Sequence, residues 1–510
     1  MQRFWRSRRA TLAALGGSLA AVALAAAAGG APAAAARFAR DDWRWGPQTQ
    51  VARAALPAGA IRHIFVIDLE NESEAVTFGA GSPATYLNGT LLRQGELIKN
   101  YYATGHVSLD NYIAQVSGQA PTDETGADCL TSFSGSLTGA YVNVTPGTLD
   151  PNQALYPGQV DGHGCIYPAG VQTIANQLDQ LYPPNPRTHV AAWREYAEDM
   201  GNQSGRELGA SDPSGGLDCA HPPVGGVDNT NSAAPATATQ PADQYATRHN
   251  PFMYFHSIID NGAECAANVV PLGKVQVGVP STLDGVSLPD TFSGHLVSDL
   301  STPWTTPKFA FITPNLCDDG HDSTCAGPNT AGQTGVGAGG LNGADQFLSH
   351  WVPLLQASPA YRDGSMLIVV TFDEASPADT SACCGETAGP SNPTPGFSPL
   401  LVPIYQHYGL PVPSSAPGGG VVGAVLLDPL YIRPGSVDST GYYNHYSALR
   451  SYEDLLGITS GGTDGLGHLG FAAAAGLQPF GADVFNQPWD QWLVDWSRWS
   501  DARGGQGYGW

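Results

Sequence analysis

The segment from Met366 to Phe372 constrains the fold of this chain more than any other. Its five consecutive apolar residues, β-branched at 368–370, predict a strand that is covered on both faces, as strands of parallel sheets are. Two carboxylates, Asp373 and Glu374, follow at its carboxyl end. Open α/β sheets bind ligands at that edge, and paired carboxylates suit a hard cation. The same pair would also suit a capped turn.

The segment from Ile61 to Leu69 repeats this pattern, because it is apolar and is followed by the oxygen donors Glu70 and Asn71. Two buried strands that end at one sheet edge could close a single cation site from ligands far apart in the sequence. A helix cap is the alternative role for the Glu-Asn pair. We therefore expect an α/β fold with a cation site built from both strands.

Residues 1–36 combine four arginines, an Ala- and Leu-rich run and small residues typical of a cleavage site, which predicts a signal peptide. A membrane anchor is the alternative, and the Sec and twin-arginine routes both stay open. We expect one catalytic domain over 37–500, followed by a flexible tail at 501–510. The Gly-, Pro- and Ser-rich stretch 201–243 predicts a disordered loop insertion. The mature protein would be exported to the periplasm or the extracellular space.

The net charge of -23 argues against nucleic-acid binding, since no basic stripe is available to neutralise phosphates. The 8 cysteines of an exported chain indicate disulfides. We predict one local bridge, between Cys317 and Cys325. Cys383 and Cys384 could join each other or bind separate partners.

Two helix starts carry polar groups that could do chemistry. His106 and Asn111 lie in a Gly-containing turn before a helix at 112–116, where they could point donors at an anion. Thr173 begins an amphipathic helix over 173–181. Its hydroxyl would serve either as an ordinary N-cap or as a nucleophile, because the helix dipole and a nearby cation would stabilise its alkoxide.

Three further histidines are candidates. His249 precedes an aromatic segment at 252–255 that we expect to be a strand, and such a histidine is most often structural. His321 follows a short strand at 309–312, in a loop where Asp322 could fix its tautomer. His445 opens a helix near the end of the chain, where we expect a structural role. A late strand is expected at 400–405.

The order of these motifs resembles the phosphoesterase family of bacterial acid phosphatases and phospholipases C, a branch of the alkaline-phosphatase superfamily. The resemblance spans most of the mature chain, from Ile61 to about Gly457. It rests on segments 68–73, 105–112, 173–178, 192–200, 248–252, 314–322, 371–374 and 443–457. It implies an alkaline-phosphatase-like, three-layer α/β sandwich with a mostly parallel central sheet.

The resemblance also implies roles for individual residues. The implied metal ligands are Glu70, Asn71, Asp373 and Glu374, the implied nucleophile is Thr173, and the histidines around the phosphate are His106, His249 and His321. One divalent metal ion is expected, with Ca²⁺, Mg²⁺ or Mn²⁺ favoured over Zn²⁺ because the ligands are oxygen-rich. The expected reaction is hydrolysis of a small phosphate ester through a phosphothreonine.

The expected substrate is a phosphomonoester. A phospholipase C and a non-catalytic secreted binding protein of the same fold are the alternatives. Four tryptophans at 489, 492, 496 and 499 share one helical face, which predicts a helix that docks on its own domain or makes shallow membrane-surface contact. The sequence leaves the oligomeric state open.

Overall fold

The computed structural model describes residues 54–486, except for 134–135, 184–189, 203–204, 229–243, 322–338, 385–387, 408–410 and 414. The predicted signal peptide, the tryptophan face, the tail, Asp322 and Cys325 therefore lie outside the described residues. Within the described part of the chain, no helix has both the length and the apolar character needed to cross a membrane.

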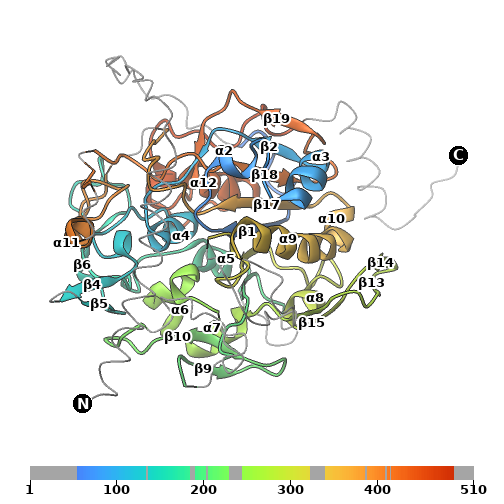
Figure 1. The fold of residues 1–510 in the computed structure, drawn as a ribbon, viewed down its shortest axis with the longest axis horizontal. Coiled ribbons are helices and arrows are strands. Elements are labelled where there is room, and N and C mark those ends of the chain that lie inside the picture. Colours follow the sequence, from blue (N-terminus) through green and yellow to red (C-terminus); the bar gives the residue numbers. More distant parts are fainter. Residues whose placement is uncertain are drawn as a thin grey trace, which may run out of the picture.

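An eight-stranded sheet has the strand order β11-β8-β16-β1-β17-β18-β2-β19. Its strands β1, β17, β18, β2 and β19 run from the centre of Figure 1 toward the top. Its strands are β11 (Val269–Pro271), β8 (Trp193–Ala197), β16 (Phe309–Thr313), β1 (His63–Leu69), β17 (Met366–Phe372), β18 (Ala424–Leu427), β2 (Glu96–Ile98) and β19 (Ser436–Asp438). Every pairing is parallel except the two made by β18. The predicted α/β class with a mostly parallel sheet is confirmed.

Helices cover both faces of this sheet. One face carries α4 (Ser108–Ser117), α5 (Ile174–Leu181) and α12 (His445–Leu455), and the other carries α8 (His295–Asp299), α9 (Gly340–Ala357) and α10 (Pro359–Arg362). Gln115 of α4 donates to Asp68 Oδ2 at 2.6 Å, whereas Ser358, between α9 and α10, donates to Met366 Sδ at 3.8 Å. Met366 is paired with His63, and side chains alternate along a strand, so Asp68 and Met366 point to opposite faces. The layers are therefore helix, sheet and helix.

The remaining elements are short and lie around these layers. They are α2 (Glu74–Thr77), η1 (Leu87–Leu91), α3 (Leu92–Gln94), β3 (Tyr101–Tyr102), η2 (Thr125–Ala127), β4 (Leu130–Phe133), β5 (Ser136–Gly139), β6 (Thr145–Leu149), β7 (Val160–His163), β9 (Leu208–Ser211), β10 (Leu217–His221), η3 (Thr247–His249), η4 (Pro251–Tyr254), α6 (His256–Ile259), α7 (Gly262–Asn268), β12 (Lys274–Gln276), β13 (Ser281–Leu283), β14 (Val286–Leu288), β15 (Thr291–Ser293), η5 (Pro399–Leu401), α11 (Val402–His407), β20 (Tyr443–Asn444) and η6 (Gly470–Ala473).

Two predicted strands are helical instead. Residues 400–405 lie in η5 and α11, because Pro399 begins a helical turn and Ser398 Oγ accepts a hydrogen bond from Leu400 N at 3.2 Å. The strand beside β17, on the side away from β1, is β18 instead. The aromatic segment 252–255 lies largely in η4, where Pro251 at the first turn favours a helical start.

The predicted disordered insertion at 201–243 is in part ordered. Strands β9 and β10 form an antiparallel hairpin, and a disulfide joins Cys219 in β10 to Cys265 in α7. The prediction was wrong there because composition does not reveal a disulfide between distant segments. Residues 229–243 lie outside the described part.

Two more disulfides are present among the described residues. Cys129 is joined to Cys165, and Cys383 is joined to its neighbour Cys384, which decides between the alternatives for that pair. Cys317 is also disulfide-bonded, whereas its predicted partner lies outside the described residues.

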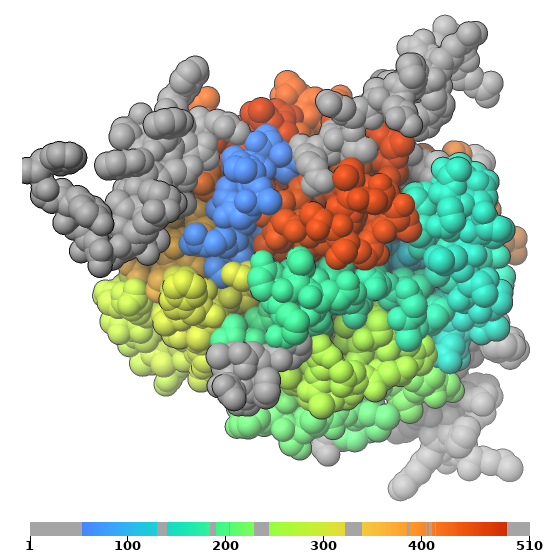
Figure 2. All heavy atoms as spheres, turned by 180° about the vertical axis from the view of Figure 1, so that it is seen from behind, coloured from blue at the N-terminus to red at the C-terminus, as the bar shows by residue number. Residues whose placement is uncertain are grey.

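The first described residues lie against the C-terminal part of the chain, as the blue and red surfaces of Figure 2 show. Ala55 N donates to Phe480 O at 3.1 Å, and Ala54 N donates to Asp454 Oδ2 at 2.9 Å. The buried His468 bridges Asp454 and Asp464, with contacts of 3.2 Å and 2.6 Å. Burial lowers the pKa of His468, but the hydrogen bonds to both carboxylates outweigh it and raise the pKa to about 9.

This bridge predicts a pH dependence of stability. The pKa of His468 is above its ordinary value of 6.5 in the folded state, so its contribution is complete below pH 6.5 and is lost as the pH rises through about 9. His468→Gln should therefore reduce the free energy of unfolding by on the order of 2 kcal/mol at neutral pH. Urea unfolding between pH 6 and 10 measures the difference between the two proteins. A difference that does not shrink with rising pH would contradict this assignment.

Candidate active site

The two predicted ligand pairs meet at the carboxyl edge of the sheet. Strands β1 and β17 are adjacent, with Leu69 paired to Phe372, so the residues that follow each strand lie side by side. Asn71 N donates to Asp373 Oδ1 at 2.8 Å, and Asp373 N donates to Leu69 O at 2.8 Å. Asn71 has a positive φ of 49°, which turns the chain sharply after Glu70. The structure thus brings these four residues together, as the two strand patterns indicate.

The side-chain amide of Asn71 lies between two carboxylates and a histidine. With its nitrogen toward the carboxylates it donates to Glu374 Oε1 at 2.8 Å and to Asp373 Oδ1 at 3.2 Å, and its oxygen accepts from His321 Nδ1 at 3.0 Å. A cation between the ends of β1 and β17 would instead take the amide oxygen as a ligand. Asp373 Oδ2 and Glu70 Oε1 are buried and make no hydrogen bond among the described residues. This oxygen-rich set fits a divalent ion of the Mg²⁺, Mn²⁺ or Ca²⁺ type.

The carboxylates at this edge repel one another away from water. Burial, followed by the charges of Glu70, Glu374 and Asp68, raises the pKa of Asp373 well above its ordinary value. Burial also raises the pKa of Glu70, although the nearby charge of Arg248 opposes this. Like charges that cannot all ionise without a counter-ion are the electrostatic signature of a cation or proton site.

His106 contacts Glu374 at Oε2, the carboxylate oxygen that does not face Asn71. Its Nδ1 contacts Glu374 Oε2, and its Nε2 lies 2.9 Å from the carbonyl oxygen of Asp379. Burial lowers the pKa of His106, but the charge of Glu374 and these hydrogen bonds raise it overall. Both ring nitrogens thus face acceptors of the protein, so His106 positions Glu374 in this structure rather than facing an open space.

The turn that carries His106 approaches the β17 end closely. Ala375 N donates to Gly419 O at 2.9 Å, and a side-chain carbon at Gly419 would lie 1.9 Å from the carbonyl oxygen of Gly105. Only glycine allows this approach. Asn111 stabilises the same turn, because its Oδ1 accepts hydrogen bonds from Thr104 N and Gly105 N at 2.9 Å each.

Ser108, which the sequence analysis did not select, lies at the centre of the cluster. It is the first residue of α4, and its Oγ donates to Glu70 Oε2 at 2.8 Å. The preceding Val107 has a φ of 77°, which is rare for a β-branched residue, and its N donates to Glu374 Oε2 at 3.1 Å. A strained backbone before a hydroxyl at a helix N-terminus is typical of a functional site.

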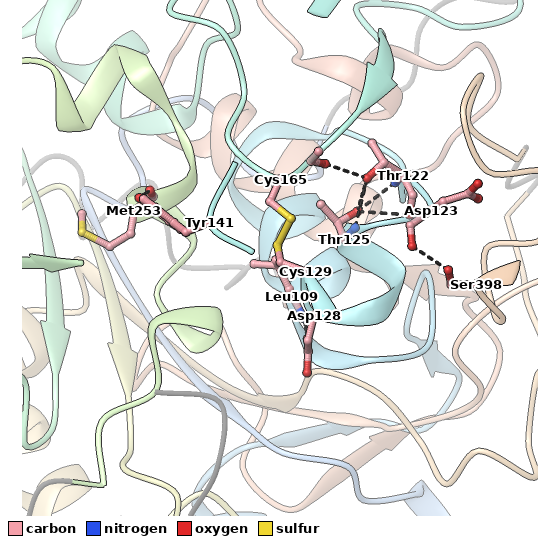
Figure 3. The surroundings of a disulfide bond; sticks show 11 residues. Leu109, Thr122, Asp123, Thr125, Asp128, Cys129, Tyr141, Cys165, Met253 and Ser398 are labelled. Carbon is pink, nitrogen blue, oxygen red and sulfur yellow. Dashed lines mark hydrogen bonds between the residues drawn. A yellow bond between two sulfur atoms is a disulfide. The ribbon is translucent and has the colours of Figure 1, made fainter. Parts of the chain in front are cut away.

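A disulfide-linked loop fixes the start of α4 (Figure 3). Leu109 N donates to Asp128 Oδ1 at 3.0 Å, and Asp128 directly precedes Cys129 of the Cys129–Cys165 bridge. Arg248 Nε lies 3.3 Å from the other oxygen of Asp128. This chain of contacts holds a guanidinium near Glu70 and orients the first turn of the helix that carries Ser108.

His249 lies deep in the same cluster. Its Nε2 is 3.1 Å from Glu70 Oε1, its Nδ1 is 4.0 Å from Asp319 Oδ2, and its ring stacks on Tyr112 with 5.2 Å between centroids. Burial, then the charge of Arg248, lowers the pKa of His249 well below its ordinary value, so the imidazole is neutral. Glu70, His249 and Asp319 offer ligand atoms within 4.8 Å of one another. These three residues are a second group of potential metal ligands, next to the oxygens of Asn71 and Asp373.

His321 lies at the rim, partly exposed. Its Nδ1 is 3.0 Å from the Asn71 amide, and its backbone N donates to Asp319 Oδ1 at 2.9 Å. It is therefore the cluster histidine nearest to solvent among those that the sequence selected.

Thr173 occupies a different environment. It is the N-cap of α5, where its Oγ1 lies 3.1 Å from Asn176 Oδ1 and accepts from Asn176 N at 3.4 Å. The hydrogen bonds of the next residues lead to Ser257 and Ser460 rather than to Glu70 or Asp373. In this structure Thr173 is therefore the N-cap of α5, which is the first of the two roles predicted for it.

The contacts of His445 are compatible with the structural role that we expected. It begins α12, and its Nε2 lies 2.7 Å from the carbonyl oxygen of Asp373. Burial lowers its pKa to about 4, so it is neutral. Ser108, Asp128, Arg248 and Asp319 are the cluster residues to which no role was assigned from the sequence. The available signal for Ser108 was its position two residues after His106, in the turn that leads to the helix predicted at 112–116.

Comparison with known proteins gives low-identity relatives. No family model matches this chain. It is 23% identical over 412 residues to a probable acid phosphatase of Kluyveromyces lactis, which covers 79% of this chain and 61% of the relative. It is 24% identical over 372 residues to the phosphate-repressible acid phosphatase of Penicillium chrysogenum, which covers 72% of this chain and 54% of the relative. The chain thus spans less than two thirds of either relative.

Solved structures resemble the chain only distantly. A protein of the alkaline phosphatase superfamily from Vibrio parahaemolyticus has a TM-score of 0.37 at 10% identity, covering 82% of this chain and 72% of that one. A mutant of the alkaline phosphatase PafA has a TM-score of 0.30 at 10% identity, covering 85% and 100%. A 2-O GAG sulfatase has a TM-score of 0.34 at 9% identity, covering 79% and 72%.

The crowded carboxylates predict an unusual response to Asp373→Asn. Without added metal, the free energy of unfolding should rise by about 1 kcal/mol, because one of several mutually repelling groups becomes neutral. The stabilisation by Mn²⁺ should largely disappear, since a ligand charge is lost. Urea unfolding with and without Mn²⁺ measures both effects.

Asp428→Asn is the matched control for that measurement. Asp428 is equally buried but caps the turn at Leu430 and Tyr431 instead of lying at the β1 and β17 ends. The Asp428→Asn variant should have a lower free energy of unfolding than the wild type but should be stabilised by Mn²⁺ to the same extent. An unchanged Mn²⁺ response in Asp373→Asn would show that the ion binds elsewhere.

Proposed function

We propose that this protein hydrolyses phosphate esters, with Ser108 as the nucleophile and with a divalent cation bound by Asn71, Asp373, Glu374 and Glu70. One observation carries the proposal. The Ser108 hydroxyl, at the N-terminus of α4, donates to Glu70 within a buried cluster whose oxygens fit a cation. This arrangement would combine a nucleophile and a proton acceptor with the positive charge of the bound cation for the phosphate.

In the first step, Ser108 Oγ attacks phosphorus and its proton passes to Glu70 Oε2 along the existing hydrogen bond. The Oγ–P bond forms, the bond from phosphorus to the ester oxygen breaks, and the departing alcohol takes up a proton. In the second step, a water oxygen bonds to phosphorus, the Oγ–P bond breaks and phosphate leaves. Ser108 Oγ takes back the proton held by Glu70, and the proton lost by the water replaces the one given to the alcohol. Water is thus the only reactant needed besides the ester.

The surrounding residues have separate tasks. His321, at the partly exposed rim, would protonate the leaving alcohol, and the neutral His249, which lies beside Glu70, would contact a phosphate oxygen or the ion. Arg248 and the N-terminus of α4 favour an anion at Ser108. His106 holds Glu374 in position. The bound cation would neutralise charge on the phosphate and lower the pKa of the attacking hydroxyl.

The relatives' names support this reaction class, because one is named a probable acid phosphatase and the other a phosphate-repressible acid phosphatase. They favour a phosphomonoester over the phospholipid alternative, and the three described disulfides support export. The phosphothreonine that the resemblance implied would require Thr173 to leave its capping box, whereas Ser108 already lies among the proposed ligands.

A pair of variants distinguishes the two hydroxyls. Ser108→Ala should lower the turnover of p-nitrophenyl phosphate by at least about 10³-fold, because the covalent step is lost. Thr173→Val should keep most of the turnover and lose about 1 kcal/mol of stability, because it removes an N-cap. Acid quenching followed by peptide mass spectrometry should find phosphate on Ser108. Phosphate on Thr173, with an inactive Thr173→Val, would restore the phosphothreonine mechanism.

Metal removal tests whether the protein is an enzyme at all. A chelator should abolish the turnover of p-nitrophenyl phosphate, and Mn²⁺ or Mg²⁺ should restore it. Glu70→Gln should need more metal to reach a lower maximum rate. A metal-binding protein that hydrolyses neither p-nitrophenyl phosphate nor phosphatidylcholine would favour the non-catalytic alternative.

A further inference from the structure

A second group of metal-ligating side chains lies on elements that the proposed active site does not use. Asp212 begins the turn between β9 and β10, Asp218 lies on β10, and His295 is the first residue of α8. One ligand atom from each lies within 4.8 Å of the others. The hairpin lies at the edge of the molecule, below the central sheet in Figure 1.

Asp212 is held in place by its own turn. Its Oδ1 accepts hydrogen bonds from Ser214 N at 2.6 Å and from the Ser214 hydroxyl. Its Oδ2 faces His295 Nε2 at 2.6 Å. The carboxylate is therefore oriented by the hairpin before any ligand arrives, which lowers the entropy lost on binding.

Asp218 gives separate evidence that a ligand binds here, because one of its oxygens has no hydrogen-bond partner. The residue is only 8% exposed, and its Oδ1 is buried without a hydrogen bond. Burial, followed by contact with the Asp212 carboxylate, raises the pKa of Asp218 to about 7. Two carboxyl groups thus touch at a protected position, with one oxygen unsatisfied. An unsatisfied buried oxygen costs about 1–3 kcal/mol unless an ion, a proton or water completes it.

We propose that Asp212, Asp218 and His295 bind a divalent transition-metal ion of the Zn²⁺ or Mn²⁺ class. Imidazole with two carboxylates suits these ions and disfavours Mg²⁺ and Ca²⁺, which take oxygen ligands. Two ligands of one tetrahedral ion lie about 3.3 Å apart, so the contact between Asp212 and His295 must open by only about 0.7 Å. The His295 side chain is 31% exposed, which leaves room for entry and for a bound water.

The ion would fasten the β9–β10 hairpin to the start of α8. The hairpin is joined to α7 by Cys219–Cys265, and α8 receives a hydrogen bond from β8 through Tyr196 and Asp299. The site would therefore be structural, distinct from the proposed hydrolysis. A proton shared between Asp212 and Asp218 is the competing account, and it predicts a response to pH without a response to metal.

The test uses the full chain carrying Asp373→Asn, which weakens the first cation site. Bound Zn²⁺ is counted by equilibrium dialysis and elemental analysis, and the melting temperature is measured with Zn²⁺ and with Mg²⁺. His295→Gln and Asp218→Asn are added separately. His350→Gln is the matched control, because His350 Nδ1 pairs with Asp290 Oδ2 at a similar 2.8 Å but lies outside the cluster.

Zn²⁺ should raise the melting temperature and Mg²⁺ should not. His295→Gln and Asp218→Asn should each lose that rise and bind one Zn²⁺ fewer than the His350→Gln control. Without metal, Asp218→Asn should be at least as stable as its parent, because the carboxyl pair is relieved, so its lost response cannot be misfolding. Equal Zn²⁺ counts in all four proteins, or no response to Zn²⁺ in the parent, would overturn the proposal.

Discussion

Mutual repulsion of buried carboxylates at the carboxyl ends of β1 and β17 is the constraint on which the rest of the site depends. Two like charges at 4 Å repel by about 4 kcal/mol at the effective dielectric constant of a protein surface. The fold offsets part of this with donors: Asn71 N and Glu374 N both reach Asp373 Oδ1, at 2.8 Å and 2.6 Å. Glu70 Oε1 and Asp373 Oδ2 receive no such bond in the described structure. A cation at this point would satisfy the remaining oxygens.

The need to stabilise these buried carboxylates also explains the strained and tightly packed backbone around them. Val107 adopts a positive φ and directs its N–H to Glu374, and Ser108 can then begin α4 with its hydroxyl against Glu70. Such a conformation persists only where neighbouring contacts over-determine it. Asp128, next to the Cys129–Cys165 disulfide, provides one of these contacts through Leu109 N. The disulfide thus helps to fix the first turn of α4 and, through it, the position of Ser108.

The sequence predicted the parts of the molecule that local pattern controls. Buried β-branched runs specify β1 and β17, and the polar pairs after them meet because parallel strands end at one edge. Local pattern failed where tertiary context decides. Residues 400–405 have strand-like composition, but Pro399 and Ser398 start a helix, and β18 takes the place in the sheet.

Side-chain roles were harder to predict than the strands that carry them. Thr173 and Ser108 are both hydroxyls at helix starts, and only the packing of α4 against β1 places one of them beside Glu70. Asp319 and Arg248 reach the cluster from distant loops that show no periodic signal. The resemblance selected His106 and His249, which the structure places in contact with Glu374 and Glu70, whereas the contacts themselves required coordinates.

The most direct test of this account is a crystal structure of the chain grown with Mn²⁺, with anomalous diffraction data to locate the ion. We expect one strong peak about 2.2 Å from the side-chain oxygen of Asn71 and from carboxylate oxygens of Asp373 and Glu374. An Asn71 amide nitrogen that donates to both carboxylates, with no anomalous peak between the ends of β1 and β17, would contradict it.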